Sequence, residues 1–304
     1  MILSLPNTTS SEINGELVRM RSEGGAVTLG RVMTLLVDAT CCDAETAISA
    51  ANGASREHPC RVIVLAKSEA TEPRLDAEIR VGGDAGASEV IVLRPSGDMT
   101  EHADTLVIPL LLPDAPIVAW WPGGPVSAPA LTALGAMAAR RITDAKGSPD
   151  VKAALLALAE GYAPGDTDLG WARTTRWRAL LASALDQAGS PTVTHVRIHG
   201  DTGSPAVLLL GAWLRRALGC DFTDTYSDDA KGLISVCLET PGGEISIVRP
   251  DGYDATFSQP GLPDHVIALP QRTLEDCLSE DLRRLDADEV YGETLIALAE
   301  ALRS

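Results

Sequence analysis

The sequence predicts an α/β protein of two domains. The N-terminal domain is expected to hold a mixed or antiparallel sheet, and the C-terminal domain a βαβ unit. Three observations lead to this prediction. Short apolar runs that suit buried strands alternate with stretches that suit helices. The chain has 304 residues, enough for two domains. Residues 161–170 are rich in Gly, Pro and Asp, as linkers are. We therefore expect domains at 1–166 and 167–304.

The N-terminal domain is expected to open with a helix that Ser10 or Ser11 caps and that Gly24-Gly25 ends. Residues 75–81 alternate between apolar and charged side chains, which indicates a half-exposed strand and favours antiparallel pairing. The elements expected in this domain are strands at 32–37, 61–65, 75–81, 90–94, 106–111 and 117–121, and helices at 10–23, 45–52, 128–140 and 150–160.

The C-terminal domain is expected to begin with a helix over 175–188 and a strand over 192–198. Ser204 and Pro205 suit the N-cap and first turn of a second helix, which ends at Gly219. A strand over 233–238 would then complete the βαβ unit. The remaining elements are strands at 244–248 and 265–269 and helices that start at Thr273 and Asp288.

Composition excludes several classes of partner. The net charge of −17 repels polyanions, so we expect neither nucleic acid nor an anionic membrane surface as a partner. The most apolar stretch, 105–122, is interrupted by three prolines and an aspartate, so no membrane span is expected. The amino terminus lacks a basic segment followed by a long apolar run, which favours a cytoplasmic protein. Six cysteines without C-x-x-C spacing suit reduced thiols. Self-association is left open.

The sequence contains no convincing catalytic, metal or cofactor motif. The glycines of 82–87 follow a strand as in dinucleotide-binding loops, but the next strand starts too early for the required helix. His195 and His199 lie on one strand, where four residues span about 13 Å, too far apart for one zinc ion. His58 and Cys60 could form a nucleophilic pair, although a helix end followed by a buried strand explains them better. We therefore predict no catalytic residue, no metal and no cofactor.

The turn at 200–204 lies between a strand and a helix, where backbone amides can bind a phosphate or carboxylate. Asp201 would oppose such an anion, and capped turns of this kind are common in α/β domains. Both interpretations stay open. The candidate anion-binding residues are Gly200, Thr202, Gly203 and Ser204.

A second group of candidates lies in 168–178, where three arginines and two tryptophans occur in an otherwise acidic chain. Arginine beside tryptophan suits an interaction hot spot, while pairing with acids of the same chain is the structural alternative. The tryptophan pair at the end of the 117–121 strand suits either a core or an interface. The candidate partner-binding residues are Trp120, Trp121, Trp171, Arg173, Arg176 and Arg178, with Arg56 and His58 second.

Five segments stand out as a set: ASREHPCRVIVLA (54–66), RLDAEIRVGGDAGASEVIVLR (74–94), VIPLLLPDAPIVAWWPG (107–123), RRITDA (140–145) and DLGWARTTRWR (168–178). Together they resemble the OpcA family, the bacterial assembly and activator proteins of glucose-6-phosphate dehydrogenase. The resemblance implies a non-catalytic partner that binds glucose-6-phosphate dehydrogenase, promotes its active oligomer and raises its activity. The resemblance therefore also implies a role in NADPH production by the oxidative pentose phosphate pathway.

The resemblance leads to one expectation about residues. Replacing Arg173 and Arg176 with alanine should weaken activation without lowering the melting temperature.

The alternative function is that of an α/β protein that binds or acts on a phosphorylated metabolite. The turn at 200–204 supports this alternative.

Overall fold

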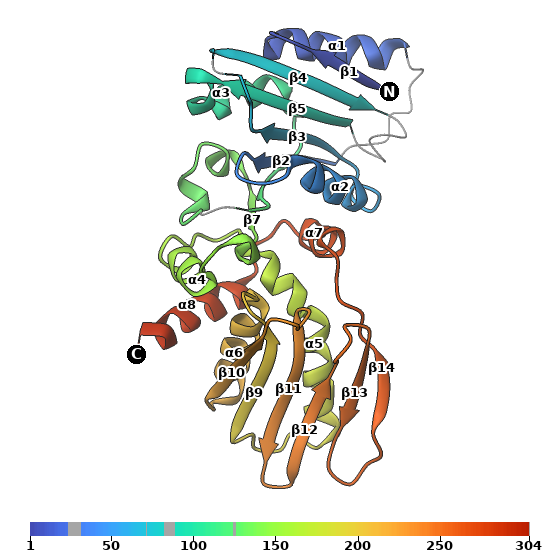
Figure 1. The fold of residues 1–304 in the computed structure, drawn as a ribbon, viewed down its shortest axis with the longest axis vertical. Coiled ribbons are helices and arrows are strands. Elements are labelled where there is room, and N and C mark those ends of the chain that lie inside the picture. The colour runs from blue at the N-terminus through green and yellow to red at the C-terminus, as the bar shows by residue number, and fades with distance from the viewer. Residues whose placement is uncertain (24–31, 71, 82–88, 124–125, 304) are drawn as a thin grey trace.

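The computed structural model describes residues 1–303 except 24–31, 71, 82–88 and 124–125. Two sheets lie at opposite ends of an elongated molecule, with helices between them (Figure 1). The protein is therefore α/β with two sheets, as the sequence predicts. Gly24-Gly25 and the glycines of 82–87 lie outside the described residues.

The first sheet has eight strands in the order β1-β4-β5-β3-β2-β6-β7-β8. The pairs β1–β4 and β4–β5 are antiparallel, and the other five pairs are parallel, so the sheet is mixed. The half-exposed strand expected near 75–81 is confirmed as β4. The strands are β1 (Ile2–Leu5), β2 (Met33–Ala39), β3 (Cys60–Ala66), β4 (Arg74–Val81), β5 (Glu89–Ser96), β6 (Ile117–Trp121), β7 (Arg140–Thr143) and β8 (Asp166–Asp168).

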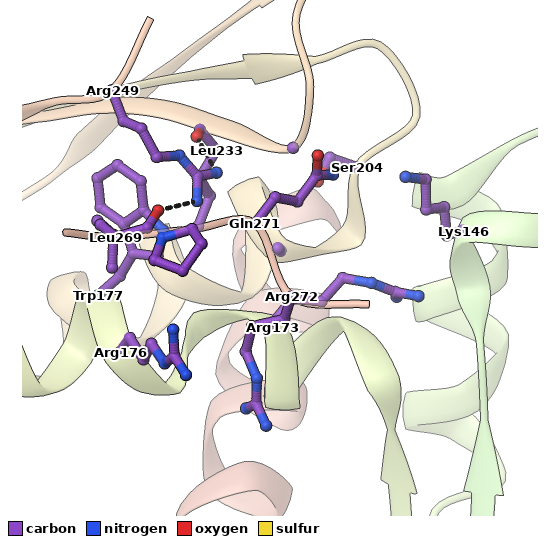
Figure 2. Close-up of a pocket in the computed structure, with 13 residues that line it drawn as sticks. Lys146, Arg173, Arg176, Trp177, Ser204, Leu233, Arg249, Leu269, Gln271 and Arg272 are labelled. Carbon is purple, nitrogen blue, oxygen red and sulfur yellow. Dashed lines mark hydrogen bonds between the residues drawn. The ribbon is translucent and has the colours of Figure 1, made fainter. Parts of the chain in front are cut away.

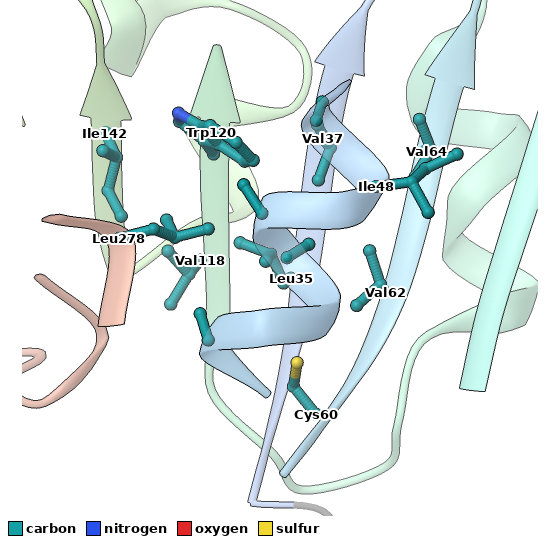
Figure 3. Close-up of a cluster of buried hydrophobic side chains, with 14 of the residues drawn as sticks. Leu35, Val37, Ile48, Cys60, Val62, Val64, Val118, Trp120, Ile142 and Leu278 are labelled. Atoms are coloured by element: carbon teal, nitrogen blue, oxygen red, sulfur yellow. The ribbon is translucent and has the colours of Figure 1, made fainter. Parts of the chain in front are cut away.

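Both faces of the first sheet are covered. Helix α1 (Ser10–Glu23) and the segment with α3 (Ala103–Val107) lie on one face. Helix α2 (Ala44–Ala54) lies on the other, together with α7 (Leu274–Leu282) from the far end of the chain. Figure 3 shows Leu278 of α7 packed near Val118 and Ile142 in this core. A sheet buried on both faces needs continuous apolar strands, which is why β3 contains the run VIVLA.

The second sheet has six strands in the order β10-β9-β11-β12-β13-β14. Only β9 and β10 are parallel, and α6 (Pro205–Leu218) connects them, so these three elements form the βαβ unit. The expectation that 233–238 completes the unit is wrong, because β11 runs antiparallel to β9. The strands are β9 (His195–Asp201), β10 (Phe222–Ser227), β11 (Leu233–Thr240), β12 (Gly243–Val248), β13 (Asp254–Ser258) and β14 (His265–Ala268).

Helices cover one face of the second sheet. Residues of α5 (Leu169–Gln187) and α6 share a core with alternate residues of the strands, such as Val196 and Ile198. Arg197, between those two, is exposed and lies on the opposite face. This alternation is typical of an antiparallel sheet with one face toward water.

Two expected elements are wrong. Residues 106–111 form the end of α3 and a 3-10 turn, Ile108–Leu110, because a six-residue apolar run suits a buried helical turn as well as a strand. Residues 128–140 form two 3-10 turns, Pro129–Leu131 and Gly135–Met137. At Gly135, an added Cβ would lie 1.8 Å from the carbonyl oxygen of Pro129, so the chain is folded too tightly there for a regular helix.

The C-terminal helices return to the first half of the chain. The predicted boundary between residues 166 and 167 falls within β8, and α7 completes the core of the first sheet, so the division into domains stays a prediction. Helices α4 (Val151–Glu160) and α8 (Glu289–Arg303) pack against each other and α6 near the middle of the molecule. Among the described helices, none is both long and apolar enough to cross a membrane.

Candidate functional site

The first half of α5 carries four of the eight predicted partner-binding residues and lies where the two halves of the molecule meet. Asp168 is its N-cap and is fully buried. The carboxylate accepts hydrogen bonds from Gly170 N (2.7 Å), Thr143 Oγ1 (2.8 Å) and Ala145 N (2.8 Å). Burial, together with the neighbouring charge of Asp144, raises the pKa of Asp168 to about 7, against the effect of those hydrogen bonds. The helix start is thus fixed by a desolvated acid.

Arg173 forms an ion pair inside the protein. Its Nη1 and Nη2 donate to the two carboxylate oxygens of Asp144 at 2.7 and 2.6 Å, a bidentate pair with Asp144 buried. The pair raises the pKa of Arg173 despite burial. Replacing Arg173 would therefore leave a buried carboxylate behind, and a melting temperature unchanged by that substitution is no longer expected.

Trp171 and Arg178 form a stacked pair inside the junction. The guanidinium carbon of Arg178 lies 3.6 Å from the centroid of the Trp171 ring. Trp171 is 3% exposed, and its Nε1 donates to Asp288 at 2.8 Å, which ties α5 to the residue before α8. Arg178 also donates to Thr174. These side chains therefore fix α5 against the start of α8.

Trp120 and Trp121 lie on β6, in the interior of the first sheet. Their side chains point to opposite covered faces and are 0% and 4% exposed. The predicted contact of these tryptophans with a partner has no surface on which to form in this structure. The sequence left core and interface open, and the central position of β6 places both in the core.

One accessible candidate, Arg176, lines what we call the junction groove, a hollow of about 170 Å³ between the end of α2, α5 and α7. Arg176 is exposed and lines it, and so does Glu57. Arg56 and His58, exposed and half-buried, flank Glu57 in the chain. Residues more than 110 positions apart in sequence thus lie at one surface. The lining residues are Gly53, Glu57, Arg176, Arg272, Glu275, Asp276, Ser279, Glu280 and Arg283.

The turn at 200–204 forms part of a second hollow. Thr202 Oγ1 donates to Asp228 at 2.7 Å, and Gly200 is packed so closely that a Cβ would lie 2.5 Å from Val207. Of the four predicted anion-binding residues, Ser204 alone lines the hollow, which we call the basic pocket (Figure 2). Its residues are Lys146, Arg173, Arg176, Trp177, Ser204, Ala206, Gly232, Leu233, Arg249, Leu269, Pro270, Gln271 and Arg272.

The two histidines of β9 form hydrogen bonds with threonines of the neighbouring strand β10. His195 Nε2 lies 2.8 Å from Thr223 Oγ1, and His199 Nδ1 lies 2.9 Å from Thr225 Oγ1. In the described part of the chain, no group of three or more His, Cys, Asp or Glu side chains is arranged to hold a metal ion.

Comparison with protein families assigns the chain. A model for the glucose-6-phosphate dehydrogenase subunit N-terminal domain matches residues 51–160, and one for the C-terminal domain of the same subunit matches residues 164–295. Together they cover well over half of the sequence. The chain belongs to the OpcA family. The family descriptions concern a subunit associated with assembly of glucose-6-phosphate dehydrogenase.

Other comparisons add little to the OpcA assignment. No curated protein matches the chain. A solved structure described as trehalose-6-phosphate from E. coli bound with UDP-2-fluoro glucose matches with 10% identity and a TM-score of 0.28. The match covers 63% of this chain and 64% of that one. A TM-score this low supports no argument about fold or function.

Three cations that line the basic pocket of this OpcA-family protein were not predicted from the sequence: Lys146, Arg249 and Arg272. They come from segments far apart in the chain and meet only around the basic pocket. No local motif marks them. Arg249 is buried, and the apolar residues that precede it in the segment ISIVRP are the sequence feature that indicates this burial.

Proposed function

We propose that this protein is a non-catalytic assembly factor that binds glucose-6-phosphate dehydrogenase in the cytoplasm, promotes its active oligomer and raises its activity. NADPH production by the oxidative pentose phosphate pathway would rise accordingly. The observation that carries the proposal is the match of both dehydrogenase-subunit domains along the chain. An activator of this kind must bind the active state of the enzyme more tightly than the inactive state, since otherwise it shifts nothing.

The junction groove is the docking surface we propose. Its walls are α2, α5 and α7, and each of these helices has its inner side in a packed core, so the surface is held in place before a partner arrives. The groove carries both signs of charge: Arg176 and Arg283 line it together with Glu57, Glu275 and Asp276. Such mixed charge favours selection of one partner and one orientation.

The test measures the rate of the cognate dehydrogenase at increasing amounts of this protein, across substrate concentrations. The wild type should raise kcat or lower KM until saturation, and should co-elute with the enzyme on a sizing column. Arg56→Glu and Arg176→Glu should each raise the concentration needed for half-activation roughly tenfold, as expected for a contributing interface residue. Both arginines are exposed, so the melting temperature should stay unchanged.

The matched control is Arg303→Glu, an exposed arginine at the end of α8 that pairs with Glu160 outside the groove. It should activate like the wild type. If Arg176→Glu in the groove and Arg56→Glu beside Glu57 both activate like the wild type, the docking surface lies elsewhere. If the wild type neither binds nor activates the enzyme, the proposed function itself is wrong.

A further inference from the structure

The basic pocket collects positive charge in a chain whose net charge is −17. Five of its lining residues are Lys or Arg, and none of its lining residues, all of them within the described part of the chain, is Asp or Glu. Lys146 comes from the segment after β7 and the others from α5 and the second sheet or its exit. The pocket therefore lies between the two halves of the molecule (Figure 2).

Three of these cations are already neutralised by acids outside the pocket. Lys146 lies 3.6 Å from Asp201, Arg173 pairs with Asp144, and Arg272 pairs with Glu280. Each of these three charges is therefore already balanced by an acid of the same chain. The two remaining cations, Arg249 and Arg176, decide whether the pocket needs an anion.

Arg249 has a buried charge with no carboxylate partner among the described residues. Its side chain donates to the carbonyl oxygens of Leu269 (2.9 Å) and Leu233 (2.7 Å), and its Nε is buried without a hydrogen-bond partner. Arg249 is 3% exposed and lies 5.2 Å from the centroid of Trp177. Burial lowers its pKa, and the charge of Asp251 opposes only part of this effect. A desolvated guanidinium is costly unless an anion pairs with it.

The first turn of α6 adds a second source of positive potential. Ser204 and Ala206, at the start of this 14-residue helix, both line the pocket, and the Ser204 side chain makes no capping hydrogen bond. Amides in the first turn lack partners within the helix, and the helix dipole favours an anion beside them. Arg176 lines the same pocket, is exposed, and has no hydrogen bond or ion pair within the described structure.

The size of the pocket limits what it can hold. Its volume is about 30 Å³, on a scale where one water needs roughly 10–15 Å³. A group of about two waters fits, which suits a phosphoryl group and excludes a whole sugar. The rest of a larger molecule would have to extend past Arg176 into solvent.

We propose that the basic pocket binds a phosphoryl group, with Arg249 and the first turn of α6 inside and Arg176 at the opening. The phosphoryl group is either inorganic phosphate or that of a small phosphate ester. The proposal does not depend on the dehydrogenase as partner.

The test uses the isolated full chain, titrated with inorganic phosphate by calorimetry and followed by thermal melting, in chloride buffer of matched ionic strength. The wild type should give a saturable isotherm and a higher melting temperature in phosphate than in chloride. Arg176→Gln should bind phosphate about tenfold more weakly, as expected for the loss of one charge-assisted hydrogen bond. Arg249→Gln should do the same where circular dichroism shows that it folds.

The control is Arg215→Gln, a partly exposed arginine in the last turn of α6 that pairs with Asp221. It should bind phosphate like the wild type. Glucose 6-phosphate and glucose form the second arm: tighter binding of the ester than of phosphate, with none of glucose, identifies an ester ligand, and the reverse identifies free phosphate. Absence of saturable phosphate binding in the wild type, or binding that Arg176→Gln leaves unchanged, would overturn the proposal. Because the dehydrogenase is absent, neither outcome bears on activation.

Discussion

The two sheets differ in how completely they are covered. The first sheet has packed helices on both faces, so residues such as Leu35 and Leu36, on opposite faces, are both buried. The second sheet has helices on one face and polar or half-exposed side chains on the other. The cover of the first sheet includes α7, which follows the second sheet in sequence. The first half of the molecule is therefore closed by residues of the second half, while the second half remains open to solvent.

This difference draws attention to the contacts that tie α7 to the first sheet. Arg140 on β7 pairs with Asp281 on α7 at 2.7 Å, and both side chains are less than 10% exposed. Arg140 also donates to the carbonyl oxygen of Asp286 at 2.7 Å. These contacts fix α7 against the first sheet and so shape the junction groove.

The largest effect is expected for Arg140→Ala. Removing one partner of a buried ion pair leaves the other charge desolvated, which costs about 3–5 kcal/mol. Urea unfolding at pH 7 measures this loss of stability. A loss below about 1 kcal/mol would show that α7 is not tied to the first sheet by this pair.

The same variant has a pH signature. Burial raises the pKa of Asp281 to about 6, while Arg140 lowers it. Without Arg140, the folded protein holds this proton to still higher pH, while the unfolded chain releases it near pH 4. Below about pH 5 both folded proteins hold the proton, so the difference between their stabilities is constant there. The variant loses stability relative to the wild type only as the pH rises through the wild-type pKa, from about 5 to 8. A stability difference that stays constant over this range would contradict the assignment.

The same contrast explains which elements the sequence could predict. Strands buried on both faces, such as β3, are continuous apolar runs and were identified within one or two residues. Strands at an edge or with polar faces were missed: β10 has the sequence FTDTYS, and β7 is RRIT. In β7 the arginines are buried because acids from distant segments, Asp166 and Asp281, pair with them. No local pattern contains that information.

The second prediction concerns the apolar cover. Leu278 on α7 is 0% exposed and packs in the core of the first sheet. Leu278→Ala should lower the free energy of unfolding by about 2–5 kcal/mol, because the protein loses the transfer free energy of the removed atoms and keeps a cavity in their place. The matched control is Val266→Ala on the edge strand β14, where the side chain is 74% exposed and the change should lie within about 0.5 kcal/mol. Equal effects at the two positions would remove the distinction between a closed and an open sheet.

The candidate site was predictable only in part, for the same physical reason. The clustering of arginine and tryptophan in 168–178 identified the junction, but not which side chains pair inward. Arg173 and Arg178 are satisfied by Asp144 and Trp171, whereas Arg176, on the same helix, is left accessible. Which arginine finds an internal partner depends on tertiary contacts, so helical spacing alone could not separate the three.

The smallest effect is expected on the open face of the second sheet. Arg197 on β9 pairs there with Glu239 on β11 and Glu244 on β12, and its side chain is 49% exposed. Water screens these pairs, and holding the side chains in place costs conformational entropy, so Arg197→Ala should cost less than about 1 kcal/mol. The cost should shrink further in high salt, whereas that of Arg140→Ala should change little. Urea unfolding of both variants at low and high salt measures the two effects. Because both variants replace arginine with alanine, the measured losses of stability can be compared directly. A large, salt-independent loss for Arg197→Ala would mean that this face is covered in solution, and that the second sheet is closed after all.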